Sequence, residues 1–127
     1  MKKNSILLIS FLGFFSFANA QSAVTFCPNT AQVGYSYGGG NLNYTKSDAY
    51  QRCINGGGQM PQFILFTDRK GYGAIAIGKG YNGVVKIGST AAATSSSAAD
   101  AGAIKSCIKE GANPNTVQIR ARWQDLR

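Results

Sequence analysis

The side chains that could carry chemistry in this chain are few, because the sequence contains no histidine. Without histidine there is no Ser-His or Cys-His nucleophile pair and no zinc site with imidazole ligands. The three cysteines, Cys27, Cys53 and Cys107, are too widely spaced to form a recognisable metal-binding motif. We therefore expect neither a bound metal nor a cofactor.

The five carboxylates are the remaining candidates for acid-base chemistry: Asp48, Asp68, Asp100, Glu110 and Asp125. Asp48 and Asp100 come just before two predicted helices or in their first turns, where a negative charge complements the helix dipole. Asp68 and Asp125 could cleave a glycoside only if their carboxyl groups lay roughly 5–9 Å apart. Nothing in the sequence places them together, so we predict a protein that is not an enzyme. A secreted effector or hydrolase that uses carboxylates is kept as an alternative.

The first twenty residues have the pattern of a secretory signal peptide. Two lysines precede an apolar run from Ile6 to Phe17, and Ala18-Asn19-Ala20 then supplies the small-x-small motif of a cleavage site. The run is too short to span a bilayer as a permanent helix. We expect cleavage before Gln21, so that residues 1–20 are removed and residues 21–127 form one small domain in the periplasm or outside the cell.

The predicted mature domain is basic. The full chain has thirteen Lys and Arg against five Asp and Glu, a formal net charge of +8. Removal of the two lysines in the signal leaves eleven against five, or +6. Such a charge favours anionic partners, such as an acidic protein or an anionic polymer of the cell envelope.

Secretion would place the three cysteines in an oxidising compartment, where at most one internal disulfide can form. Cys27 lies near the end of the first extended segment and Cys53 on a predicted helix, so we favour a Cys27–Cys53 bridge. A Cys53–Cys107 bridge would need closely touching helices, because the Cα atoms of linked cysteines lie within about 7 Å. We interpret Cys107 as a small buried hydrophobic residue rather than a reactive thiol.

The sequence after the signal indicates two copies of one unit, about residues 21–68 and 69–127. Ala49–Ile54 and Ala103–Ile108 place Ala, a large residue, Cys and Ile at the same helical spacing. A glycine four residues after each cysteine, with a proline beyond it, indicates the end of each helix.

Ser89–Ala103 is expected to be a loop that runs into the second helix. Extended segments are expected at Gln32–Tyr37, Phe63–Phe66, Tyr72–Ile77, Val84–Ile87 and Val117–Trp123, with Asn82-Gly83 as a hairpin turn.

The order of these elements reads β-β-α-β twice, which predicts an α+β fold. We expect an antiparallel sheet with both helices on one face. The other face would then be exposed to water or would meet a partner.

Basic and aromatic side chains give the only binding signal. Arg120 and Arg122 alternate with apolar residues on the last predicted strand, so both should point away from the core. We expect a cationic platform on the open sheet face, formed by Lys79, Tyr81, Lys86, Arg120 and Arg122. This predicts a protein-binding module whose partner is a protein of the cell envelope, for example a toxin-immunity or inhibitor protein. The alternative ligand is an anionic envelope polymer, and no motif supports nucleic-acid binding.

The stretch Tyr72-Gly73-Ala74-Ile75-Ala76, the strand after it and the Ala-rich helix that ends in Cys107 resemble a family of secreted bacterial proteins. This is the family catalogued as domain of unknown function 4189, and the resemblance covers about residues 33–122. It implies a fold and a secreted location, and it brings no established catalytic residues. Family members usually carry a further cysteine after the helix, where this chain has Asn113-Pro114-Asn115, so the resemblance assigns no disulfide here.

Overall fold

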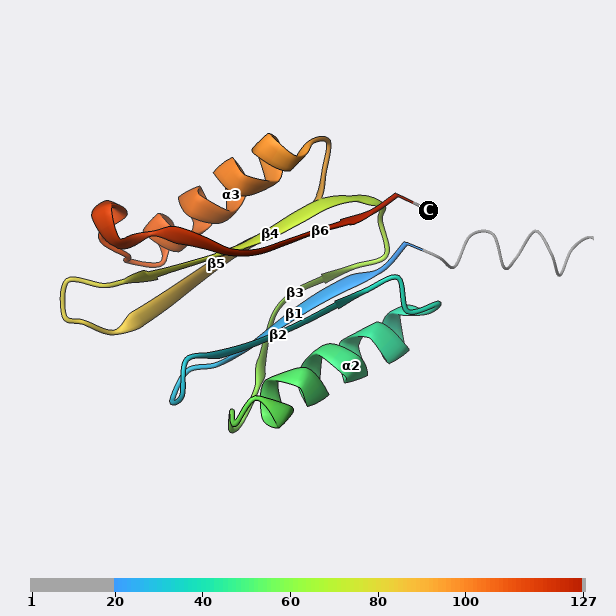
Figure 1. Cartoon of the computed structure of the whole chain (residues 1–127), viewed down its shortest axis with the longest axis horizontal. Coiled ribbons are helices and arrows are strands. Elements are labelled where there is room, and N and C mark those ends of the chain that lie inside the picture. The colour runs from blue at the N-terminus through green and yellow to red at the C-terminus, as the bar shows by residue number, and fades with distance from the viewer. Residues whose placement is uncertain (1–19, 127) are drawn as a thin grey trace, which may run out of the picture.

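The computed structural model describes residues 20–126, which contain the same order of elements twice (Figure 1). The first half consists of β1 (Ser22–Cys27), β2 (Gln32–Tyr37), α2 (Leu42–Asn55) and β3 (Gln62–Thr67). The second half consists of β4 (Gly71–Lys79), β5 (Val85–Ala93), α3 (Ser96–Lys109), the 3-10 turn η1 (Pro114–Thr116) and β6 (Gln118–Asp125). Each half therefore has the predicted β-β-α-β order. The predicted signal peptide lies outside the described residues, apart from its last residue.

The strands form two antiparallel sheets of three strands, in the orders β2-β1-β3 and β5-β4-β6. The two sheets stack, with α2 on the outer face of the first and α3 on the outer face of the second (Figure 1). The predicted α+β fold is confirmed. The detailed arrangement differs from a single sheet with both helices on one face, because each half forms its own sheet. The faces that we expected to be open cover each other.

The central strands β1 and β4 explain this four-layer arrangement. In β1, Thr25 bonds to the backbone of α2, whereas Val24 and its alternate neighbour Phe26 belong to the core between the sheets. In β4, the small Ala74 and Ala76 pack against α3, whereas Ile75 joins the core between the sheets. A single sheet would leave these large apolar residues in water on its second face, so stacking two sheets is favoured.

Glycine allows each helix to lie close to its sheet. A Cβ atom added at Gly34 in β2 would lie 2.2 Å from the carbonyl oxygen of Ala49 in α2. The same addition at Gly88 in β5 would lie 2.3 Å from the carbonyl oxygen of Ala103 in α3. The two contacts are equivalent, since an offset of 54 residues relates 34 to 88 and 49 to 103. This offset aligns the first sheet-helix unit with the second.

The helix ends follow local rules. Gly57 and Gly111 have positive φ angles of +96° and +110° directly after α2 and α3, which confirms the predicted helix stops. The predicted loop from Ser89 to Ala103 is wrong in its first part. β5 continues through Ala93, because its backbone pairs with β4, and α3 begins at Ser96.

Neither helix of residues 20–126 combines the length and the apolarity that crossing a bilayer requires.

Candidate functional site

The predicted cationic platform is divided in the structure. α3 lies over the sheet face that carries Arg122, and Arg122 pairs with Asp100 of that helix. The pair is bidentate, with distances of 2.9 Å from Nε to Oδ1 and 2.9 Å from Nη2 to Oδ2. Hydrogen bonding to Asp100 and its negative charge raise the pKa of Arg122. The positive charge of Arg122 is therefore already paired with a carboxylate of the same chain.

The other four predicted binding residues gather near the β4–β5 hairpin. Tyr81 at the hairpin tip is 82% exposed. Lys79 and Arg120 line one shallow groove with a volume of about 430 Å³. The Lys86 side chain lies beside Gly80 and Gly111. The structure thus brings Lys79 and Arg120 together and leaves Arg122 with Asp100, while the binding role of all five residues stays a prediction.

The expected helix-start positions of Asp48 and Asp100 are wrong. α2 and α3 begin at Leu42 and Ser96, and their caps are Asn41 and Ser95, whose side chains accept hydrogen bonds from main-chain N–H groups. Both aspartates lie further inside the helices, where their carboxylates bind arginines. The polar, small-residue first turns hid the true helix starts from the sequence pattern.

Cys53 and Cys107 are buried on α2 and α3, and Cys27 is buried at the end of β1. The sulfur atoms of Cys27 and Cys53 are 2.7 Å apart, and both residues are fully buried free thiols in this structure. Burial and the neighbouring Cys53 raise the pKa of Cys27 to about 12. Cys107 is buried on α3, on the opposite side of the sandwich from α2, so a bridge to Cys53 has no path (Figure 1). The Cys27–Cys53 disulfide stays a prediction.

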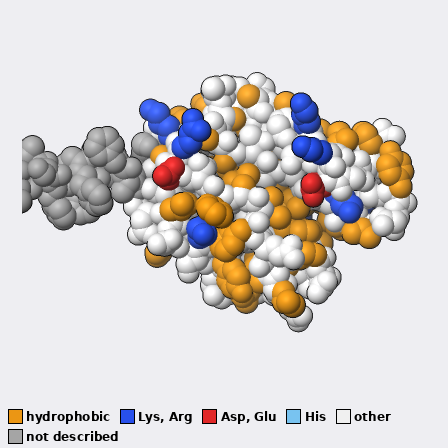
Figure 2. Space-filling view, turned by 180° about the vertical axis from the view of Figure 1, so that it is seen from behind, with side chains coloured by type: hydrophobic (Ala, Val, Ile, Leu, Met, Phe, Trp, Pro, Cys, Tyr) orange, Lys and Arg blue, Asp and Glu red, His pale blue; other side chains and the backbone are white. Residues whose placement is uncertain are grey.

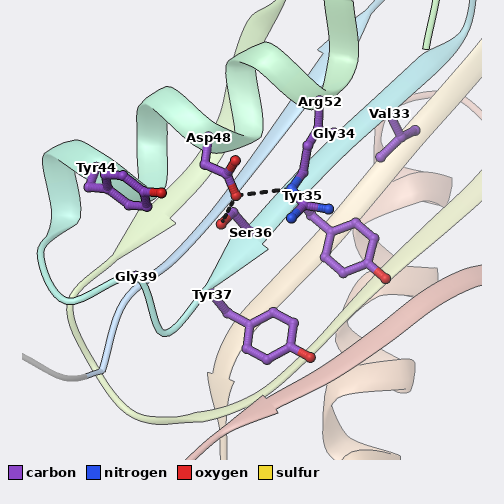
Figure 3. A pocket seen from close by; sticks show the side chains of 9 residues that line it. All are labelled: Val33, Gly34, Tyr35, Ser36, Tyr37, Gly39, Tyr44, Asp48 and Arg52. Atoms are coloured by element: carbon purple, nitrogen blue, oxygen red, sulfur yellow. Dashed lines mark hydrogen bonds and ion pairs between the residues drawn. The ribbon is translucent and has the colours of Figure 1, made fainter. Parts of the chain in front are cut away.

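A groove that the sequence analysis did not find lies along the outer edge of β2, beside α2. We call it the tyrosine groove. Its volume is about 570 Å³, and its main side chains are Tyr35, Tyr37, Tyr44, Asp48 and Arg52 (Figure 3). The sequence held a signal for it, since Tyr44, Asp48 and Arg52 follow at intervals of four residues and so share one helix face.

An ion pair and a hydroxyl form the helix side of the tyrosine groove. Asp48 Oδ2 accepts hydrogen bonds from Ser36 Oγ at 2.7 Å and from Arg52 Nε at 2.9 Å. These two bonds lower the pKa of Asp48, so the carboxylate stays ionised at neutral pH. On the sheet side, the rings of Tyr35 and Tyr37 stack on Trp123, with centroid distances of 5.5 and 6.5 Å. The groove therefore holds a salt bridge rather than a free acid or base.

A second candidate surface lies on the other flank of α2. We call Tyr50, Phe63 and Phe66, with the aliphatic part of Lys46, the β3 patch. Phe63 contacts both other rings, and the Lys46 ammonium lies 4.0 Å from the centroid of Phe66 and 5.1 Å from that of Phe63. Phe66 is 49% exposed, and Ile54, Met60 and Ile64 are further exposed apolar residues of this segment. Figure 2 shows hydrophobic side chains gathered in the lower half of the molecule, where α2 and its sheet lie.

Comparison with known proteins identifies one family. The family model described as Domain of unknown function (DUF4189) matches residues 21–121. No curated protein and no solved structure matches the chain. Among residues 20–126, no three His, Cys, Asp or Glu side chains gather as a metal site would require.

Proposed function

We propose that this chain, which belongs to the family described as Domain of unknown function (DUF4189), is a secreted, non-catalytic module that binds another protein. A role in neutralising that protein, as an immunity or inhibitor protein does, is the most concrete form of the proposal. The family match begins at Gln21, the residue after the predicted cleavage site, and β1 begins at Ser22. This coincidence supports removal of residues 1–20 before the domain acts.

The β3 patch is the observation that carries the proposal. β3 is an edge strand, and edge strands of soluble proteins are usually protected by charges, prolines or bulges. Here Phe63, Ile64 and Phe66 are at least 37% exposed instead. Aromatic side chains that are exposed in a cluster on a monomer are typical of protein-protein interfaces. We therefore place the binding surface on β3 and the adjacent flank of α2.

Lys46 adds charge to this apolar surface. Its ammonium lies over two aromatic rings, and it makes no ion pair within the described residues. A partner carboxylate that met Lys46 would be shielded from water by Phe63 and Phe66, and such enclosed pairs are typical of binding hot spots. The net charge of +6 that remains after removal of the signal would attract the same kind of partner. We therefore expect a partner surface that is apolar with acidic groups.

The environment of the carboxylates supports a role without catalysis. Asp48 and Asp100 are bound to arginines, and Asp125 accepts a hydrogen bond from the backbone nitrogen of Gln21. A general acid needs a carboxyl group whose pKa is raised toward neutrality. The hydrogen bonds from Ser36 and Arg52 lower the pKa of Asp48 instead.

Photo-cross-linking tests the proposal. A photoreactive residue at Met60, which is 78% exposed, should capture one protein from an envelope extract at a one-to-one ratio. The same residue at Tyr81, which is 82% exposed and belongs to the cationic platform predicted from the sequence, distinguishes that surface from the β3 patch. Phe63→Ser with Phe66→Ser should abolish capture, and Tyr81→Ser should not. Capture that survives the double change would contradict the β3 patch, and salt-sensitive retention on wall polymer instead would favour the anionic-polymer alternative.

A further inference from the structure

β2 has an open edge beside the tyrosine groove. It is the outer strand of the order β2-β1-β3, and among residues 20–126 it pairs with β1 alone. The backbone nitrogen of Gly38 donates to the carbonyl oxygen of Gln21. This bond determines which residues of β2 form backbone hydrogen bonds with β1. Because bonded and non-bonded pairs alternate in an antiparallel ladder, the backbone groups of Val33, Tyr35 and Tyr37 point away from β1. These groups are free to pair with another strand.

The tyrosine groove provides side-chain contacts on both sides of this edge. Tyr35 and Tyr37 lie on the face toward the second sheet, and Tyr44, Asp48 and Arg52 form a row on α2 (Figure 3). The Arg52 side chain is 62% exposed, and only its Nε is used in the bond to Asp48. Its terminal nitrogens are therefore available to an incoming carboxylate.

The second half of the molecule carries other side chains at the positions equivalent to the tyrosine groove. The offset of 54 residues that relates Gly34 to Gly88 also relates the groove residues to positions on β5 and α3. Tyr44, Asp48 and Arg52 correspond to Ala98, Gly102 and Ser106. Tyr35 and Tyr37 correspond to Ser89 and Ala91. Small residues stand at all five of these positions in the second half. Tyr35 and Tyr37 have a structural role, since they stack on Trp123, so it is the polar row on α2 that calls for another explanation.

We infer that the β2 edge binds an extended, acidic segment of a partner protein, which adds to the sheet as a further strand beside β2. Backbone hydrogen bonds to residues 33–37 would supply affinity, and alternate side chains of the segment would lie against the tyrosines and against the α2 row. A carboxylate of the segment would bind the terminal nitrogens of Arg52. This surface is separate from the β3 patch and does not depend on it.

Synthetic peptides test the inference directly. The first peptide alternates threonine and valine, carries one central aspartate, and has six residues, the length of β2. A second peptide replaces the aspartate by lysine, and a third carries N-methyl groups on every second amide of the first. Calorimetry should show binding of the first peptide, with each of the other two weaker by at least about tenfold. Equal binding of the N-methylated peptide, or no binding of the first at millimolar concentration, would overturn the inference.

Protein variants separate this site from the proposed function. Arg52→Gln should remove the preference for the aspartate peptide over the lysine peptide, and Tyr44→Ala should weaken both. Phe63→Ser with Phe66→Ser should leave peptide binding unchanged, because those residues lie on the other flank of α2. Loss of peptide binding in that double variant with an unchanged melting temperature would place the peptide on the β3 patch and refute the β2 site.

Discussion

Cys27 and Gly78 occupy equivalent positions in the two halves of the molecule. Cys27 pairs with Gln32 across β1 and β2, and Gly78 pairs with Lys86 across β4 and β5, with the same offset of 54 residues between the partners Gln32 and Lys86. Cys53 and Cys107 are likewise equivalent, because the Cys53 thiol donates to the carbonyl oxygen of Gln32 and the Cys107 thiol donates to that of Lys86. The odd number of cysteines thus has a structural reason: the second half has glycine where the first has the partner thiol.

We expect Cys27 and Cys53 to form a disulfide in the oxidising compartment to which we propose that the chain is secreted, because their sulfurs lie 2.7 Å apart. Alkylation of the denatured, non-reduced protein should label Cys107 alone, and intact mass should show one bridge. Cys107→Ser should then give no label, which is the control. Labelling of three thiols in protein purified from the periplasm would contradict the bridge.

A second bridge should be obtainable by copying the first half. Gly78→Cys alone should destabilise the fold, because a side chain there meets Ala112 at 3.1 Å and Val117 at 2.9 Å. In the first half, the position equivalent to Ala112 is Gly58, which lies beside Cys27 and has no side chain to meet it. Gly78→Cys with Ala112→Gly should therefore be more stable than the single change and should protect Cys107 from alkylation. Persistent labelling of Cys107 in the double variant would show that the halves are not equivalent there.

Trp123 is the most consequential single side chain of the core between the sheets. It is 5% exposed, stacks on Tyr35 and Tyr37, and donates from Nε1 to Ser22 Oγ at 2.9 Å. Trp123→Ala should lower the free energy of unfolding by about 3–5 kcal/mol. Trp123→Phe should lower it less, because it keeps most of the apolar area and loses the hydrogen bond. Urea denaturation measures both, and equal losses in the two variants would contradict this account.

Asp48 should make the fold sensitive to acid. Ser36 and Arg52 lower its pKa from the ordinary value of 3.8, so its stabilising bonds are intact above about pH 4 and are lost as pH falls through the lowered pKa. Asp48→Asn should lower the free energy of unfolding by about 0.5–1 kcal/mol at pH 7, because the pair is partly exposed. Denaturation at a series of pH values should show this difference shrinking toward pH 2.5. A difference that stays constant with pH would exclude the ionised carboxylate as its cause.

Local signals made much of the fold predictable. Asn82-Gly83 indicated the β4–β5 hairpin, and Gly57 and Gly111 indicated the helix ends, because each depends only on neighbouring residues. The division into two sheets was not predictable in this way. It depends on β3 returning to β1 rather than continuing to β4, and that choice is made by the core around Ile75 and Trp123, which joins distant parts of the chain.

The binding surfaces were harder to predict than the fold. Arg122 has the alternation of an exposed strand residue, and it is exposed, but its partner Asp100 comes from a helix that was expected to leave that face open. The run Phe63–Phe66 was identified as a strand, yet its position at a sheet edge depends on strand order, which periodicity does not contain. Charge and hydropathy therefore indicated what kinds of group were present, and only the topology showed where they meet.

The short link between the halves has a consequence for how the molecule holds together. Residues 68–70 alone join β3 to β4, and each half would expose the core between the sheets if it stood by itself. The domain thus resembles a dimer whose two subunits are joined by a tether. Because of the tether, each half meets the other at an effective concentration of about millimolar or higher, instead of by diffusion between separate chains. Cleavage of the link by a protease would turn one folding unit into two chains. The melting temperature of the nicked protein should then rise with its concentration, whereas that of the intact chain should not.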